Sequence, residues 1–461
     1  MNEDKRTPLH HAALNGRPST VELLLTGGAF IEVVDRDGNT PLHLAAWKGQ
    51  TDVVELLLDK GASIQAKNNY FNTPLHLAAW SGHTGMVELL VGRGSLIEDI
   101  NKYHNTPLHL AALKGHTSIV ELLLAKGVST ETFGQLQNTP LLLATQGGHI
   151  DTMKLLLEND ALVQAENVFG STALHIAIWN GYTDILELLL RSGAPIDDPD
   201  RSGRAPLHVA VLCGYTGVAQ LLLEIGARTL ARDADSNTPL HLAAWNGHTG
   251  MVELLLGKGA WIEATNHTGD TALHYAAEYD HTGIVELLLQ KGASTEATDV
   301  FGSAPLHLAA QGGRTGAAEI LLENGASIEA LDQANRTPLH LAARTGHTGM
   351  VELLLGNGAL IEATSSAGET PLHCATEGGH IGVVELLLQE GALTEAMDYY
   401  DNTPLHHAAQ GGHTDVVELL LENGAQIEAM NDTDNTPLML AAQKYHIDIV
   451  QLLNSKLSIH E

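Results

Sequence analysis

Residues 237–260 read NTPLHLAAWNGHTGMVELLLGKGA, and the rest of the chain consists of variations on this stretch. Residues 72–95 nearly copy it as NTPLHLAAWSGHTGMVELLVGRGS. A period between 20 and 50 residues is typical of solenoids and other repeat arrays, so we expect fourteen stacked repeats. The tetrads of TPLH type recur every 33 residues without insertion or deletion, and they open at Thr7, Thr40, Thr73, Thr106, Thr139, Thr172, Ala205, Thr238, Thr271, Ala304, Thr337, Thr370, Thr403 and Thr436.

The sequence of each repeat predicts two short helices. In the repeat of Thr238, this Thr is a good N-cap, and Pro239 suits the first helical position because its missing N–H would have no helical partner there. Gly247 favours a turn after the first helix, and we expect Thr249 to cap the second helix. Helices of about ten residues are too short to persist alone in water, so their stability has to come from stacking.

These features resemble the ankyrin-repeat family. The chain reads DRDGNTPLHLAA from Asp35, and a later Gly, a VELLL run and Gly61-Ala62 follow in the order that the family has. The resemblance covers essentially the whole chain. It implies an all-α solenoid of stacked helix-turn-helix repeats with β-hairpin tips, which forms a curved, elongated rod. We therefore expect a single ankyrin-repeat domain over residues 1–461.

Two of the repeats that depart from the pattern lead to predictions. The last repeat, residues 436–461, has Met439 and Tyr445 in place of the usual His and Gly, and its added polar residues indicate a C-terminal capping unit. The fifth repeat has Leu142 for the tetrad His and Asp160 for the Gly that ends the second helix. Because Asp adopts the left-handed conformation less readily than Gly, we predict a soft joint at the fifth repeat.

Composition narrows the class of partner and the compartment. The formal net charge is −31, from 24 Lys and Arg against 55 Asp and Glu, which argues against nucleic acid or an anionic membrane and favours basic proteins or peptides. The two cysteines, Cys213 and Cys374, exclude a disulfide framework and indicate a reducing compartment. No apolar run is long enough to span a bilayer and no signal peptide is visible, so we expect a cytoplasmic, intracellular protein.

The 26 histidines do not indicate a metal site. Zinc needs three or four ligands at about 2.0 to 2.3 Å from one ion, whereas equivalent residues of stacked repeats lie about 10 Å apart. The resemblance implies instead that the tetrad His bonds the Thr hydroxyl and the neighbouring backbone. No Walker-type loop or HExxH motif is present, and His208 beside Cys213 is a tetrad residue. We therefore expect no enzyme, no metal and no cofactor.

The acidic residues form two ladders. One follows the second helices, as at Glu253, and the other follows the segments after them, from Glu32 to Glu461. Successive members lie about one Debye length apart at 0.1 M salt, so their mutual repulsion is largely screened. Two interpretations stay open, a solvated outer face and a docking strip for a basic partner.

The slot seven residues after the tetrad Thr carries the strongest functional signal. It is large and apolar in seven of the first eight repeats and in none of the last six, and it holds four of the five tryptophans. In chain order the slot holds Leu14, Trp47, Trp80, Leu113, Gln146, Trp179, Leu212, Trp245, Glu278, Gln311, Arg344, Glu377, Gln410 and Gln443. The third tip residue is also large and apolar in four successive repeats, at Tyr70, Tyr103, Leu136 and Phe169.

In the family that the chain resembles, this slot and the tips line the concave groove where partners lie. Exposed apolar residues mark binding surfaces, and Trp and Tyr are enriched among the residues that dominate binding. The alternative is that the rings only stack on one another. We predict a protein–protein interaction scaffold, whose partner presents apolar anchors with Lys or Arg beside them. The predicted binding residues are Trp47, Tyr70, Trp80, Tyr103, Leu113, Leu136, Phe169, Trp179, Leu212 and Trp245.

Two other functions remain open. A structural or mechanical spacer would have no sharply defined site. The targeting arm of a larger protein, such as a microbial effector, would be accompanied by a further segment that performs a different task.

Overall fold

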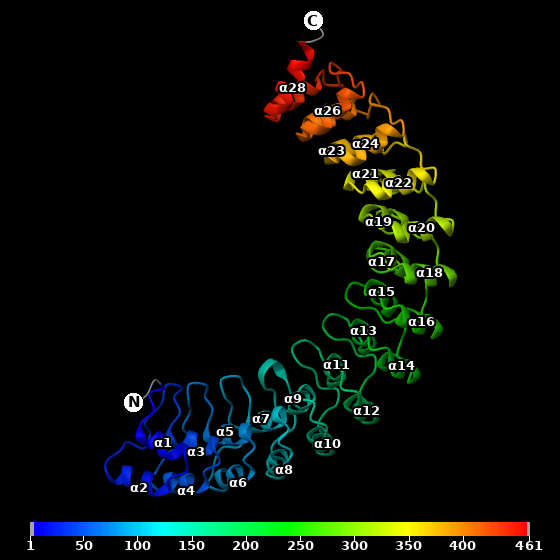
Figure 1. The fold of residues 1–461 in the computed structure, drawn as a ribbon. Helices are drawn as coiled ribbons and strands as arrows, with labels where there is room; N and C mark the ends of the chain where they lie inside the picture. The colour runs from blue at the N-terminus through cyan, green and yellow to red at the C-terminus, as the bar shows by residue number, and fades with distance from the viewer. Residues whose placement is uncertain (1–3, 459–461) are drawn as a thin grey trace. The chain divides into compact units, whose positions relative to one another are not determined.

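The protein is represented by a computed structural model that describes residues 4–458. It divides into two compact units, Met1–Ala227 and Arg228–Glu461. Between residues 4 and 458, each unit contains seven pairs of α-helices, one pair for each repeat (Figure 1). Glu461, the last member of the expected acidic ladder, and residues 459–461 of the expected capping unit lie outside the described residues.

In the first unit, the first helix of every pair begins directly after the tetrad Thr or its substitute. These helices are α1 (Pro8–Leu14), α3 (Pro41–Trp47), α5 (Pro74–Ser81), α7 (Pro107–Lys114), α9 (Pro140–Gln146), α11 (Ala173–Trp179) and α13 (Pro206–Leu212). The second helices are α2 (Pro18–Thr26), α4 (Thr51–Asp59), α6 (Thr84–Gly92), α8 (Thr117–Ala125), α10 (Ile150–Glu158), α12 (Thr183–Arg191) and α14 (Thr216–Glu224). A short 3-10 turn, η1 (Gln135–Gln137), precedes α9.

The second unit has the same order of elements. Its first helices are α15 (Pro239–Trp245), α17 (Ala272–Glu278), α19 (Pro305–Gly312), α21 (Pro338–Thr345), α23 (Pro371–Gly378), α25 (Pro404–Gly411) and α27 (Pro437–Gln443). Its second helices are α16 (Thr249–Gly257), α18 (Thr282–Gln290), α20 (Thr315–Glu323), α22 (Thr348–Gly356), α24 (Ile381–Gln389), α26 (Thr414–Glu422) and α28 (Ile447–Leu457).

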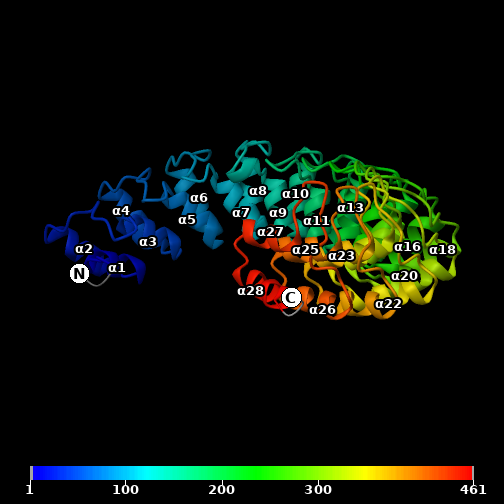
Figure 2. The same cartoon turned by 90° about the horizontal axis from the view of Figure 1, so that it is seen from above.

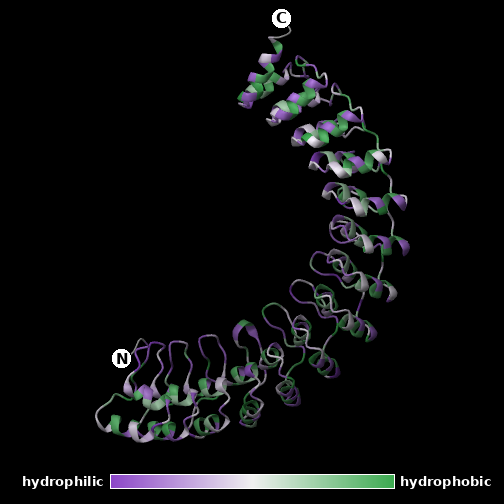
Figure 3. Cartoon of the chain, in the orientation of Figure 1, coloured by the Kyte–Doolittle hydropathy of each residue, from purple (hydrophilic) through white to green (hydrophobic). Residues whose placement is uncertain are grey.

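Within each unit, the helices form two layers. In the first unit α3 packs against α1, α4 and α5, while α4 packs against α2 and α6, and the two layers are visible in both views (Figures 1 and 2). Leu42, Ala45 and Ala46 of α3 are buried, as are Val54 and Leu57 of α4. The alanines have small side chains, so neighbouring helices can approach closely. Hydrophilic residues dominate the tips that precede the first helices, and the apolar residues lie on the helices (Figure 3).

The tetrad His links one repeat to the next, in addition to the bond with the Thr hydroxyl that the resemblance implies. Thr40 is the N-cap of α3 and Pro41 is its first residue. The Nδ1 atom of His43 accepts from the backbone N–H of Thr40 at 3.1 Å and lies 2.9 Å from its hydroxyl. The Nε2–H of His43 donates to the carbonyl of Asn72 in the following repeat at 2.9 Å. Burial lowers the pKa of His43 to about 4, so its imidazole is neutral near pH 7.

The tips are tight turns, and the residues that the structure describes include no β-strand. The expected β-hairpins are therefore not confirmed. In the turn from Asp35 to Asn39, the Asp35 N–H donates to the Asn39 carbonyl, and the Asp35 carboxylate accepts from the N–H groups of Asp37 and Asn39. Asn69 N–H donates to the Asp37 carbonyl of the previous tip. A single main-chain bond of this kind joins two turns without forming a β-ladder.

Asparagine side chains add a second link between tips. The Asn68 amide donates to the side-chain oxygen of Asn39 at 2.8 Å, while its own oxygen accepts from the N–H groups of Tyr70 and Asn72. Both asparagines are buried. Four further pairs, each 29 residues apart, make the same amide-to-amide bond: Asn101–Asn72, Asn167–Asn138, Asn266–Asn237 and Asn431–Asn402.

The second acidic ladder has a structural role. The Glu362 carboxylate accepts from the backbone N–H of Leu393, 31 residues later, at 2.8 Å. Seven more pairs with this spacing are Glu32–Ser63, Glu98–Ser129, Glu131–Leu162, Glu263–Ser294, Glu296–Ser327, Glu329–Leu360 and Glu395–Gln426. These carboxylates connect neighbouring repeats, which neither a solvated face nor a docking strip requires.

Three details differ from the expected pattern or extend it. Thr249 was expected to cap α16, but it is the first helical residue and His248 is the N-cap, without a side-chain cap bond. Asp160 adopts the left-handed conformation with φ of 62°, and Leu142 is buried, while the soft joint at this repeat stays a prediction. In the last repeat Met439 and Tyr445 are exposed.

Candidate binding site

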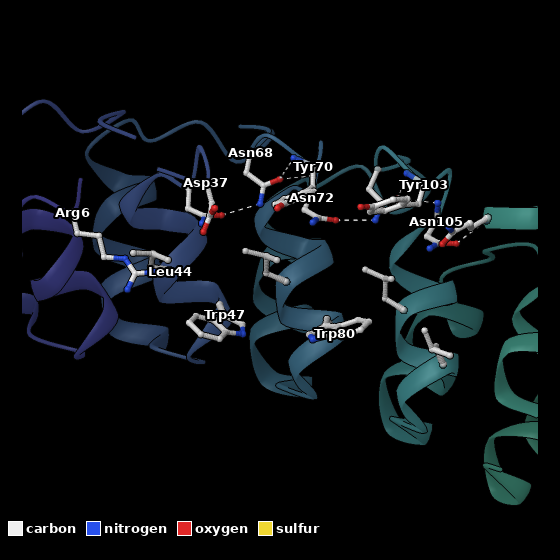
Figure 4. A pocket seen from close by; sticks show the side chains of 16 residues that line it. Arg6, Asp37, Leu44, Trp47, Asn68, Tyr70, Asn72, Trp80, Tyr103 and Asn105 are labelled. Carbon is white, nitrogen blue, oxygen red and sulfur yellow. Dashed lines mark hydrogen bonds between the residues drawn. The ribbon is translucent and has the colours of Figure 1, made fainter. Parts of the chain in front are cut away.

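A cleft in the first unit brings together five of the ten predicted binding residues. Its volume is about 490 Å³. Trp47, Trp80 and Leu113 border it at the ends of α3 and α5 and near the end of α7. Tyr70 and Tyr103 border it from the tips above these helices (Figure 4). We call the cleft formed by these five residues the indole pocket.

The pocket also contains further residues, which the sequence analysis did not single out. Leu44, Leu77 and Leu110, which follow the tetrad His by one residue, add apolar surface from the first helices. The polar lining comes mainly from the linked asparagines of the tips, Asn39, Asn68, Asn72, Asn101 and Asn105. Because these amides already bond one another or the backbone, the pocket presents apolar rings beside a polar edge that is held in place.

The two indole rings of the pocket are accessible. Trp47 is 37% exposed and Trp80 is 39% exposed. Within residues 4–458, no ring contact joins two tryptophans of the slot. The rings contact cations instead: Lys48 Nζ lies 4.2 Å from the Trp47 ring centroid, and Lys114 Nζ lies 3.9 Å from that of Trp80. Stacking of the indoles on one another therefore does not explain why the slot holds Trp.

The histidines after the inter-helix Gly position the tryptophan backbone. His83 Nε2–H donates to the Trp47 carbonyl at 3.1 Å, and His116 Nε2–H donates to the Trp80 carbonyl at 3.0 Å. Each carbonyl lies near the end of a first helix, where the helix itself supplies no N–H partner. The sequence shows these histidines as a regular ladder, but the bond that each makes to the previous repeat is visible only in the structure.

Five predicted residues lie outside the indole pocket. Leu136, Phe169 and Trp179 belong to the same unit and are 48%, 57% and 45% exposed, while Leu212 is half-buried. Trp245 lies in the second unit, is 44% exposed, and has its ring centroid 6.5 Å from that of Tyr275. All five keep accessible surface, but none borders the pocket.

The tip of the third repeat contains a strained aromatic residue. Phe71 has φ of 57° and is 53% exposed. The equivalent residue of the preceding tip is Gly38, with φ of 79°. A bulky side chain in this left-handed region costs about 1 to 2 kcal/mol. Positive φ recurs at this position in other tips, as at His104 and Gln137, so it belongs to the turn and does not by itself mark a site. Phe71 directly follows Tyr70, which lines the pocket.

Further findings on the described residues concern metal binding, the two thiols and membrane-spanning helices. No group of three or more His, Cys, Asp or Glu between residues 4 and 458 could hold a metal ion. Burial raises the pKa of Cys374 to about 12 and raises that of Cys213, so both thiols are protonated near pH 7. Over the same residues, no helix combines the length and the apolar character that crossing a membrane requires.

Comparison with known families agrees with the repeat architecture. Segments that match the model described as "Ankyrin repeats (3 copies)" cover residues 1–68, 65–133, 130–200, 162–233, 192–266, 240–332, 306–398, 361–431 and 393–460. A search of curated proteins gave no match. Ankyrin repeats are generally protein–protein interaction modules, and proteins built from them are typically non-enzymatic scaffolds. Because the matches span almost every residue, the chain belongs to the ankyrin-repeat family.

Proposed function

We propose that this chain is a non-enzymatic scaffold whose indole pocket holds an apolar segment of a partner protein. The observation that carries the proposal is the meeting of Trp47, Trp80, Tyr70 and Tyr103 at one accessible cleft. These residue types dominate the binding energy of protein interfaces. A volume of about 490 Å³ is within the usual range of binding pockets, which is about 300 to 1,000 Å³.

The scaffold is suited to a rigid mode of binding. The Trp80 backbone is held by His116, and the tip beside Tyr70 is held by the Asn68–Asn39 bond. A partner segment therefore does not have to order these elements when it binds, which reduces the entropy cost of association. Burial of one large apolar anchor in such a site contributes about 1.5 to 3 kcal/mol.

The remaining predicted residues extend the proposal within each unit separately. Leu136, Phe169, Trp179 and Leu212 would contact further parts of a partner along the first unit, and Trp245 is a proposed contact of the second unit taken by itself. Basic segments of the partner are expected at the second unit, where most of the negative charge lies. Residues 1–227 carry 15 Lys and Arg against 24 Asp and Glu, a balance of −9, whereas residues 228–461 carry 9 against 31, a balance of −22.

Affinity capture with three forms of the full chain tests the proposal. The intact chain, a Trp47→Ala/Trp80→Ala variant and a Trp261→Ala control are compared by quantitative mass spectrometry. Trp261 is 56% exposed and lies outside the slot, so its loss should leave the captured proteins unchanged. The pocket variant should lose at least one saturable partner that the control retains. Equal capture by all three forms would show that the indole pocket is not the binding site.

Two readouts separate the alternative explanations. Thermal unfolding of the pocket variant should change little, because a collapse of stability would make the two indoles packing residues. A structural spacer would give no saturable partner with any form. The targeting arm of a larger protein would bind through the same pocket, and a longer reading frame with a second functional segment would distinguish it.

A further inference from the structure

Four cations near the indole pocket have no acidic partner. Arg36, Lys48, Lys102 and Lys114 are exposed, and among the described residues no carboxylate lies within 4.0 Å of their charged nitrogens. Some other cations of the first unit do have such a partner, as in Lys60–Glu22, Lys67–Asp99 and Arg93–Asp59. What distinguishes these cations is their position relative to the indole pocket.

Two of the four cations lie over indoles of the pocket, and the other two are chain neighbours of residues that line it. Lys48 and Lys114 follow the slot residues Trp47 and Leu113, and their ammonium groups lie over the faces of Trp47 and Trp80. Arg36 and Lys102 directly precede Asp37 and Tyr103, which line the pocket from the tips. Asp37 is the single acidic side chain that lines the pocket. The rim is therefore locally basic.

The corresponding positions of the second unit lack this basic character. After the slot they hold Asn246, Tyr279, Gly312, Thr345, Gly378, Gly411 and Lys444. At the second tip position they hold Ala234, His267, Val300, Gln333, Ser366, Tyr399 and Asp432. Lys444 is the one Lys or Arg among these fourteen residues. The positive rim thus coincides with the indole pocket and is not a property of every repeat.

The cations at the rim lose water when a segment binds in the pocket, and this loss affects which segments can bind. A segment that covers the indoles also removes water from the ammonium groups of Lys48 and Lys114, because each lies against a ring. Removing a charge from water is unfavourable unless an opposite charge replaces the lost hydration. A partner with Lys or Arg at these points would instead place like charges together.

We propose that the segment bound in the indole pocket carries Asp or Glu beside its apolar anchors. This inference rests on the proposed function, because it specifies the chemistry of the segment that the pocket holds. The ammonium groups of Lys48 and Lys114 lie over the rings of Trp47 and Trp80, which are one repeat apart, or about 10 Å for one helix layer. An extended chain advances about 3.3 Å for each residue, so the two acidic residues should be about three positions apart.

Selection from a peptide library tests the inference on the intact chain. A phage library of random twelve-residue peptides is selected on the immobilised protein, and each enriched peptide is then tested against the Trp80→Ala variant. Peptides that lose binding define the occupants of the pocket. These peptides should be enriched in Asp and Glu relative to the unselected library, with an aromatic or aliphatic residue between two acids. Higher salt should weaken their binding, since screening reduces interactions between accessible charges.

Charge reversal provides a matched control. Lys48→Glu/Lys114→Glu should weaken the selected peptides at least tenfold. The control variant, Lys126→Glu/Lys258→Glu, makes the same change at two exposed lysines that end second helices, α8 and α16, and it should bind normally. Both variants place Glu at helix C-termini, so their effects on folding are comparable. Thermal unfolding of each variant verifies this.

The outcomes separate this inference from the proposed function. If no selected peptide depends on Trp80, the proposed function fails. If peptides depend on Trp80 but show no enrichment in acids, or are enriched in Lys and Arg, the pocket stands and the acidic partner is wrong. A fluorescent single-stranded oligonucleotide is included as a further probe. Its binding, if lost in both the Trp80→Ala and the Lys48→Glu/Lys114→Glu variants, would assign the site to nucleic acid and overturn the inference.

Discussion

The Nε2–H of His116 donates a 3.0 Å hydrogen bond to the carbonyl of Trp80, which belongs to the preceding repeat. The imidazole also lies against Gly82, where an added Cβ would be 2.6 Å from His116 Cε1. The bond and the close packing together fix the end of α5, which carries an indole of the pocket. The position of that indole therefore depends on a residue of the following repeat.

We expect His116→Ala to lower the free energy of unfolding by about 1 kcal/mol, because one hydrogen bond is lost at a site that water can reach. It should also weaken binding at the indole pocket, although His116 does not line it. Urea denaturation and titration with a pocket peptide measure the two effects. His11→Ala is the control, since His11 is exposed on α1 and makes no interaction of this kind. Equal peptide binding by both variants would contradict the positioning role.

The buried tetrad histidines predict a loss of stability in mild acid. Burial lowers the pKa of His43, His76, His109, His241 and His373 from 6.5 to about 4. Between these pH values the unfolded chain binds protons that the folded chain excludes. The contribution of these histidines to the free energy of unfolding is therefore fully present above about pH 6.5. It falls as the pH decreases toward 4, by up to about 1.4 kcal/mol per pH unit for each histidine.

A His76→Leu variant isolates one of these titrations. Leu142 occupies the same slot and is buried, so the repeat tolerates Leu there. At pH 7 the variant should be less stable, because the bond from His76 Nε2 to the Asn105 carbonyl is lost. Its pH dependence below 6.5 should be shallower by about one proton. Urea denaturation from pH 7 to 4.5 measures both quantities, and an unchanged slope would mean that His76 charges in the folded state.

The asparagine pairs predict that the stability lost by substituting one partner is partly recovered by substituting the other. Asn68→Asp removes the amide that donates to Asn39 and sets a carboxylate against a carbonyl oxygen, so it should cost about 2 kcal/mol. Where the tip begins with Asp200 or Asp332, the residue 29 positions earlier is Ser171 or Ser303. Adding Asn39→Ser should therefore recover part of the loss.

A double-mutant cycle measured by urea denaturation tests this coupling. Single Asn39→Ser, single Asn68→Asp and the double variant are compared with the unmodified chain. Coupled residues give a double variant that is more stable than the sum of the single effects allows. Additive effects would show that the 29-residue pairing does not discriminate Asn from Asp.

The repeat period and the helix pairs could be predicted from sequence because they depend on local signals. Thr40, Pro41 and the spacing of apolar residues act within one repeat, and the structure confirms the helices that they predict. The pairs that join repeats were missed for a physical reason. The residues around Asn68 do not indicate its partner, because Asn39 lies 29 residues earlier and contacts Asn68 only when two repeats stack. Comparing each tip with the preceding tip would have revealed the pairing.

The candidate site was predictable in part. The slot identified Trp47 and Trp80 because an apolar residue repeated at a solvent-facing position stands out in the sequence. The extent of the pocket did not follow, because it depends on how far side chains of adjacent repeats reach. The local charge was also hidden: the sequence gives a net −31, whereas Lys48 and Lys114 lie at the pocket. Net charge averages over surfaces that a partner never contacts at once.

Replacing Phe71 in the tip of the third repeat is expected to raise stability and to weaken binding. Phe71→Gly should raise the free energy of unfolding by about 0.5 to 1 kcal/mol, because Gly adopts a positive φ without strain. The variant should bind pocket peptides less tightly if the exposed ring contributes to the site beside Tyr70.

Phe301→Gly is the matched control, since Phe301 is a 63% exposed tip residue that does not have a positive φ. It lacks strain to relieve, so it should not gain stability. Urea denaturation of both variants decides between strain relief and a general effect of Gly in tips, and a gain in both would exclude stored strain at Phe71.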